Sequence, residues 1–178
     1  YFAAFGVALQ RIAGASFQAI LSNGCFGDIN NCDFDNPPRS SPDPYFQIRR
    51  VANVVAAEAW RVWSSLREEE FRDDVPLGGR LEMVPFKARV PSPEELAAAK
   101  ERYAGPGTCR DLEWAYAREL VLMMDQPSEW EIPISAMRVG DLGLVGLPGE
   151  VFTEIGLEIK ARSPFSQTMI LGLGNGSV

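Results

Sequence analysis

The sequence contains no histidine, and this absence limits its chemistry more than any other feature. Histidine is the usual general base, the usual partner of a nucleophilic serine and a frequent zinc ligand. Cysteine is also scarce, since Cys25, Cys32 and Cys109 form no CxxC pair, and neither a disulfide framework nor a zinc knuckle is supported. Cys25 and Cys32 would close a small loop in an oxidising compartment, but free buried thiols are the favoured interpretation.

Basic clusters and long apolar runs are missing as well. Lys and Arg total 17 against 24 Asp and Glu, a net charge of -7, which argues against a nucleic-acid partner. No apolar run approaches the roughly 20 residues that span a bilayer, so we expect a soluble protein without a transmembrane segment. The chain begins at Tyr1 without Met and ends directly after a strand-like run. We therefore expect an interior piece of a longer protein, secreted or periplasmic if a leader was removed.

What the sequence does contain predicts one α/β domain spanning residues 1–178, with a mixed sheet flanked by helices. With 46% hydrophobic residues, the chain is long enough for one core and too short for two. Ser92-Pro-Glu-Glu95 is a capping box that opens a helix, and we expect Thr108 to cap the next one. Apolar spacing predicts helices at 1–13, 45–66, 93–103, 108–124 and from 151, and strands at 16–21, 79–90, 130–139, 142–147 and 167–173.

The stretch 139–162 organises the chain, because it predicts a strand, a tight turn and a helix in direct succession. Gly140-Asp141 is a hairpin signal, 142–147 is an apolar run of strand length, and Pro148-Gly149 ends it. Glu150 is thus predicted at the carboxyl end of a buried strand, where open α/β sheets place their chemistry. The structural alternative is a first-turn acid that the helix dipole favours.

A second polar cluster occupies residues 22–36. Gly24 and Gly27 allow close approach of the backbone. Oxygen and amide groups come from Asn23, Asp28, Asn30, Asn31, Asp33 and Asp35. Such a loop can hold a hard cation or orient a substrate. The commoner outcome for this composition is a set of Asx turns that bond their own backbone, and the acid spacing does not match an EF-hand.

Two motifs together resemble the neutral/alkaline (non-lysosomal) ceramidase superfamily, most closely its bacterial ceramidase-like members. These are Asn23-Gly-Cys-Phe-Gly-Asp-Ile-Asn30 and Leu147-Pro-Gly-Glu150-Val-Phe-Thr-Glu-Ile-Gly156, followed by Leu171-Gly-Leu-Gly-Asn175-Gly. The resemblance implies an α/β domain with a zinc ion bound by two His, one Glu and one Tyr. It also implies hydrolysis of the amide bond of N-acyl sphingosine, a lipid-like substrate.

On this resemblance, Glu150 falls on the zinc-binding Glu, and the turn at Gly27-Asp28 falls on the one that carries the family's Ser nucleophile. Asn30 occupies that Ser position, and an amide cannot attack a carbonyl as an alkoxide does. The His ligands would lie before Tyr1 and the Tyr ligand after Val178. The predicted site has Asp28 and Asn30 as catalytic candidates, Glu150 as the zinc ligand, and a substrate-binding group of Asn23, Gly24, Gly27 and Asn175.

Three functional hypotheses remain open. The first is a zinc-dependent hydrolase that cleaves an amide or ester with metal-bound water in place of the missing Ser. The second is a non-catalytic binding or structural member of the same fold, favoured by Asn30 and by the lack of His. The third is sugar or cyclitol chemistry, with Asp28, Asp33 or Asp35 and Glu150 as an acid/base pair about 5–10 Å apart.

Overall fold

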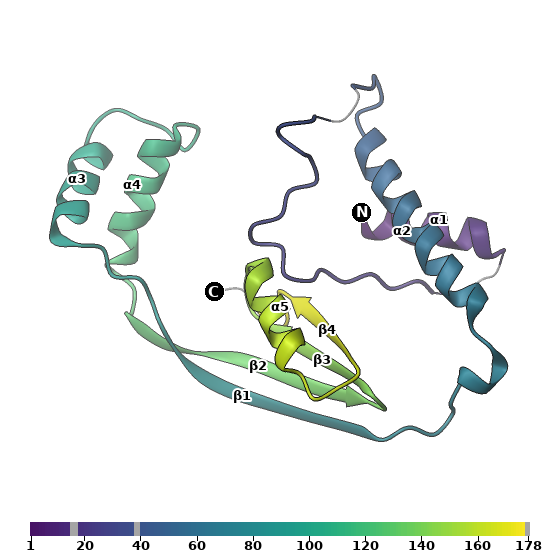
Figure 1. Cartoon of the computed structure of the whole chain (residues 1–178). Coiled ribbons are helices and arrows are strands. Elements are labelled where there is room, and N and C mark those ends of the chain that lie inside the picture. Colours follow the sequence, from purple (N-terminus) through teal and green to yellow (C-terminus); the bar gives the residue numbers. More distant parts are fainter. Residues whose placement is uncertain (15–17, 38–39, 177–178) are drawn as a thin grey trace. The chain divides into compact units, whose positions relative to one another are not determined.

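The computed structural model describes residues 1–14, 18–37 and 40–176 (Figure 1). Residue contacts divide the chain into two compact units, 1–82 with 133–178 and 83–132. The predicted α/β class with a mixed sheet and flanking helices is confirmed, and the assignment of 1–178 to a single domain stays a prediction. None of the helices in the described residues is long and apolar enough to cross a membrane.

One four-stranded sheet runs in the order β1-β2-β3-β4, with β1 at Leu77–Lys87, β2 at Glu129–Val139, β3 at Leu142–Leu147 and β4 at Gln167–Gly172. The strands β2 and β3 are antiparallel and pair from Val139 with Leu142 onward, so the predicted hairpin is confirmed. Gly140 has φ 60, a conformation that favours glycine. The pairing of β3 with β4 is parallel, and the sheet is therefore mixed.

Helix α5, Thr153–Arg162, connects β3 to the parallel strand β4 and so forms a βαβ unit. Gly156 is its buried residue, and a Cβ there would lie 3.8 Å from Ile170 of β4 and 2.6 Å from the Cys25 sulfur. The apolar residues Phe152 and Ile155 are 58% and 49% exposed. The helix thus approaches β4 through a glycine, while part of its apolar surface is left uncovered by the described residues.

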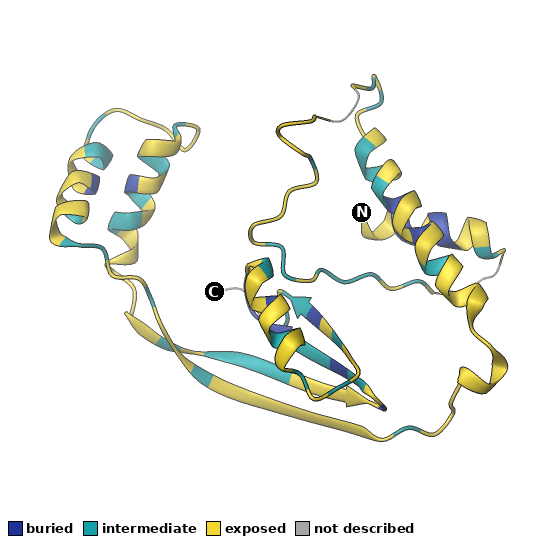
Figure 2. Ribbon diagram, in the orientation of Figure 1, coloured by how far each residue is buried: buried dark blue, intermediate teal, exposed yellow. Residues whose placement is uncertain are grey.

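The helices α1, Phe2–Ala13, and α2, Phe46–Ser65, pack together around a small buried core (Figure 2). Gly14 ends α1 in the left-handed conformation, which favours glycine, and the observed helix matches the one predicted at 1–13. The core contains Phe5, Ala8, Leu9, Ala52 and Ala56. A short 3-10 turn, η1 at Glu68–Glu70, follows α2 and has no buried residue.

The strand predicted at 16–21 is wrong for its described part. Residues 18–21 belong to no strand, and Ser16 and Phe17 lie outside the described residues. Ala19 and Leu21 instead pack against the core between α1 and α2. An apolar pattern too short to show a period fits a helix-packed segment as well as a strand, and here packing decided the outcome.

The unit 83–132 carries a helical hairpin made of α3, Pro93–Ala104, and α4, Leu112–Met123. The predicted capping box of α3 is present, since Glu95 N–H donates to Ser92 Oγ and Ser92 N–H to the Glu95 carboxylate. The predicted cap of α4 is wrong. Asp111, not Thr108, accepts the amide of Trp114 at 3.1 Å, whereas Thr108 accepts the amide of Arg110 outside the helix.

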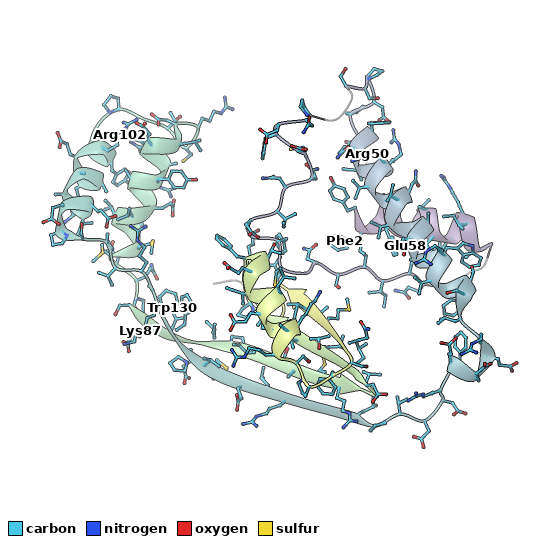
Figure 3. All side chains as sticks on the ribbon, in the orientation of Figure 1. Phe2, Arg50, Glu58, Lys87, Arg102 and Trp130 are labelled. Atoms are coloured by element: carbon cyan, nitrogen blue, oxygen red, sulfur yellow. The ribbon has the colours of Figure 1, made fainter. Side chains whose placement is uncertain are left out.

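Aromatic contacts hold this unit together. The rings of Tyr103 and Trp114 lie 5.2 Å apart between α3 and α4, and those of Phe86 and Trp130 lie 5.6 Å apart on the paired strands. Figure 3 shows Lys87 and Trp130 on the strands next to the helices, where the Lys87 ammonium lies 2.9 Å from the Glu129 carboxylate.

Candidate functional site

The candidate site lies at the edge of the sheet where β3 and β4 both end. Because these strands are parallel, their carboxyl ends, Leu147 and Gly172, are paired at the same edge. Gly149 turns the chain there with φ 78, a value that favours glycine. Glu150 follows and is exposed, and its carboxylate forms no hydrogen bond or ion pair with any residue that the structure describes. It is therefore available to a ligand.

The segment after β4 folds back onto this turn. Gly174 N–H donates to Leu147 O at 2.8 Å, and Leu173 N–H donates to Gly149 O at 3.2 Å. Asn175 adopts a left-handed conformation, φ 67, and its side-chain amide donates to Ser135 Oγ of β2 at 3.0 Å. The predicted substrate-binding residue Asn175 is thereby tied to the sheet beside the turn, and Ser135 is a partner that the sequence did not reveal.

The first half of the polar loop, 23–28, docks on the same edge. Asn23 O accepts the amide of Gly172 at 3.0 Å, and Gly27 N–H donates to Val151 O at 3.0 Å. A Cβ on Gly27 would lie 2.8 Å from Phe152 Cδ1 and closer still to the Glu150 carbonyl oxygen. Only a residue without a side chain allows this approach.

Asp28 binds the first turn of α5 across 125 residues of sequence. Its Oδ1 accepts both the amide and the hydroxyl of Thr153, each at 2.8 Å. Phe152, the residue at the N-cap position, offers no side-chain acceptor, so Asp28 supplies the missing helix cap from another segment. The hydrogen bonds from Thr153, the backbone one above all, lower the pKa of Asp28 below its ordinary value.

The second half of the loop, 31–36, turns away from this edge to α2. Gln47 of α2 donates to Asn31 O at 2.6 Å. Asp33 Oδ1 accepts the backbone amides of Asp35 and Asn36, which is the Asx-turn alternative. The hydrogen bond from the Asn36 side chain, followed by these backbone bonds, lowers the pKa of Asp33. This use of the Asp33 carboxylate disfavours it as half of an acid/base pair with Glu150.

Asn30 stands between these two halves. Its side chain is exposed and has no hydrogen-bond partner among the described residues. Asn30 follows Asp28 in the loop and takes no part in these hydrogen bonds. The structure brings together six of the predicted site residues at the corner between β3 and α5: Asn23, Gly24, Gly27, Asp28, Glu150 and Asn175. Thr153 was missed in the sequence, although a Thr shortly after Pro-Gly is a recognisable helix-start signal.

A cavity of about 390 Å³ lies against this corner. Its lining includes Gly24, Cys25, Thr153 and Lys160, from the loop 23–28 and α5, together with residues of β4. Burial raises the pKa of the Cys25 thiol, and all three cysteines are free. A larger cavity of about 590 Å³ between α5 and the sheet contains none of the predicted site residues. Size alone therefore does not mark the site, and the convergence of the polar segments does.

The described residues of the corner do not form a complete set of metal ligands. Across 1–14, 18–37 and 40–176 the structure contains no group of three or more His, Cys, Asp and Glu side chains placed to hold a metal ion. A zinc ion bound by Glu150 would take its other ligands from elsewhere, because zinc sites in proteins use three or four protein ligands.

The fold defined by these elements is a ceramidase-like α/β fold, consistent with part of a larger domain. The chain is similar to the solved structure of neutral ceramidase from Pseudomonas aeruginosa, with a TM-score of 0.57 and 15% sequence identity. The similarity covers 98% of this chain and 34% of that one, so the chain spans about a third of the length of the ceramidase. At this identity the likeness concerns the fold alone. No family model matches the chain, and no curated protein matches its sequence.

Proposed function

We propose that the chain belongs to a zinc-dependent hydrolase that cleaves an amide bond of an N-acyl, lipid-like substrate or an ester bond. The observation that carries the proposal is the convergence of three separate segments, 23–28, 147–153 and 172–176, on the edge where β3 and β4 end. This is the edge at which open α/β sheets bind ligands. Within these segments Glu150 is exposed and forms no hydrogen bond or ion pair with a described residue.

In this proposal the corner supplies one zinc ligand, the Glu150 carboxylate. A carboxylate is an ordinary zinc ligand, and Glu150 has no ion pair or hydrogen bond to a described residue that binding would break. Zinc, when bound, polarises a carbonyl and lowers the pKa of its water to about 7. Glu150 would hold the metal, and the neighbouring backbone of Gly24 and Gly27 would contact the substrate.

The amide side chains at the corner suit substrate binding. Asn23 and Asn175 belong to the segments that meet at the corner, where the Asn175 amide donates to Ser135. The side-chain amide of Asn30 has no partner among the described residues, and it can donate to a carbonyl oxygen and accept from a hydroxyl. Asn30 cannot serve as the nucleophile, so in our proposal it orients the substrate and water attacks the carbonyl.

Turnover of a fluorescent N-acyl sphingosine and of an aryl ester by the intact protein tests the proposal. Glu150→Gln keeps the size of the side chain and removes its charge, and we expect it to reduce kcat/KM by about 100-fold, because a metal ligand is lost. Glu154→Gln is the matched control, since Glu154 is exposed in the first turn of α5 and has no partner among the described residues. Equal turnover by wild type and Glu150→Gln contradicts the proposal.

The second candidate is a binding protein of the same fold without catalysis. Asn30 at the position of the family's Ser and the lack of His favour it. Saturable binding of the N-acyl lipid by wild type, with no turnover of either substrate when zinc is supplied, would select this candidate over the hydrolase.

A further inference from the structure

We propose that Asp28 is a positioning residue that fixes the turn carrying Glu150, and that it is not the acid or base of the reaction. Its effect on catalysis rests on the function proposed above, whereas its effect on the turn does not. The starting point is the pair of hydrogen bonds that reach from Asp28 to Thr153, a residue 125 positions away.

The first step concerns the helix end. An α-helix leaves its first amide groups without intrahelical partners, and a side-chain oxygen close in sequence usually accepts one of them. In α5 no local side chain does so, because the N-cap residue is Phe152. Asp28 takes over this function, and the beginning of α5 therefore depends on the loop 23–28.

The second step concerns the turn between β3 and α5. Gly27 N–H donates to Val151 O, and the Asp28 carboxylate accepts from Thr153. Two adjacent loop residues therefore hold the residues directly before and after Phe152. Glu150 directly precedes this stretch. Its backbone also lies against Gly27, where a Cβ would be 2.9 Å from the Glu150 carbonyl carbon. Loss of the Asp28 hydrogen bonds would leave only the bond from Gly27 to Val151, and the backbone conformation at Glu150 would become more variable.

The third step separates positioning from proton transfer. Asp28 Oδ1 accepts two hydrogen bonds, both from Thr153, so this oxygen is already engaged in holding the start of α5. Asparagine offers the same carbonyl-type oxygen and caps helices about as well as aspartate, but it can neither take up nor release a proton. If Asp28 positions the turn, Asp28→Asn keeps its function and Asp28→Ala loses it. If Asp28 transfers a proton, both variants lose it.

Hydrogen exchange of backbone amides in the intact protein tests directly whether Asp28 holds the turn. In Asp28→Ala we expect exchange at Thr153 and Gly27 to accelerate about fivefold or more, and in Asp28→Asn to stay close to wild type. Asp33→Ala is the control for exchange, because Asp33 is an exposed loop aspartate whose hydrogen bonds are local. Unchanged exchange in Asp28→Ala, or the same change in Asp33→Ala, overturns the inference.

Kinetics and zinc content of the same variants test the catalytic consequence. We expect Asp28→Ala to lower kcat and zinc retention, and Asp28→Asn to recover most of both. If Asp28→Asn is as inactive as Asp28→Ala while its exchange matches wild type, Asp28 acts on protons and the inference is wrong. If wild type itself binds no zinc and turns over no substrate, the proposed function fails, and the exchange result still decides whether Asp28 holds the turn.

Discussion

Replacing Gly27 by Ala is the sharpest perturbation of the corner that the structure offers. The added Cβ would lie 2.8 Å from Phe152 Cδ1 and 2.9 Å from the Glu150 carbonyl carbon, against an ordinary contact of about 3.5–4.0 Å. The loop must therefore move by about 1 Å. Overpacking of this kind costs about 2 kcal/mol, and the hydrogen bond from Gly27 to Val151, now 3.0 Å, is worth about 1 kcal/mol more.

The expected loss of about 3 kcal/mol corresponds to a fall in Tm of roughly 6–12 °C for a chain of this size, measurable by thermal or urea unfolding followed by circular dichroism. Gly6→Ala is the matched control, because Gly6 lies in α1 and a Cβ there has no atom within 4 Å. Alanine favours a helix interior by about 0.5–1 kcal/mol, so this variant should gain stability. Equal stability of Gly27→Ala and wild type would refute the docking of the loop on the corner.

Three further predictions concern other parts of the chain. Asp111→Ala should lower the helicity and the Tm of the unit 83–132, because the cap of α4 and the ion pair with Arg102 are lost. Thr108→Ala should change helicity and Tm little, and a larger loss in Thr108→Ala than in Asp111→Ala would contradict the assigned cap. The Ser92 amide, then the charge of Arg89, lowers the pKa of Glu95, so its contribution to stability is present above the ordinary glutamate pKa of about 4.3 and is lost as pH falls through the lowered value. An acid titration by circular dichroism should therefore show loss of helix only below about pH 4, and loss near neutral pH would disagree. Ser22→Ala should be neutral or stabilising by up to about 1 kcal/mol in urea unfolding, because Ser22 Oγ is buried without a hydrogen-bond partner among the described residues, and a clear loss of stability would speak against this.

Local signals in the sequence were sufficient for much of the fold. The hairpin at Gly140-Asp141 and the capping box at Ser92 involve neighbouring residues only, and both are confirmed. The boundaries of β3 also match the prediction, because turn residues flank its apolar run on both sides. Where the partner of a segment lies close in sequence, residue type and spacing define the geometry.

Predictions were wrong where a contact between distant segments competes with the local signal. Residues 18–21 have the composition of a buried strand, but only Ala19 and Leu21 pack against the core of α1 and α2, and Ile20 is 83% exposed. The cap of α4 is a local error of another kind. Asp111 lies directly before the helix, where it accepts the amide of Trp114, and it also pairs with Arg102 at the end of α3.

The sequence indicated candidate residues for the site, but it did not indicate the contacts between them. The turn signal after β3 located Glu150, and the Asn/Asp/Gly composition located the loop 23–28. The bonds of Asp28 to Thr153 join residues 125 positions apart, a separation at which no spacing rule operates. The same holds for Gly27, whose contact with the Glu150 backbone depends on how the loop folds over the sheet edge.

The zinc content of the intact protein tests the central claim most directly, because the account makes Glu150 a ligand and not a surface acid. After dialysis against a weak chelator, mass spectrometry of the metal should find about one zinc per chain in wild type and in Glu154→Gln, and much less in Glu150→Gln. Wild type without zinc, or Glu150→Gln with as much zinc as wild type, would contradict the assignment of Glu150 as a metal ligand.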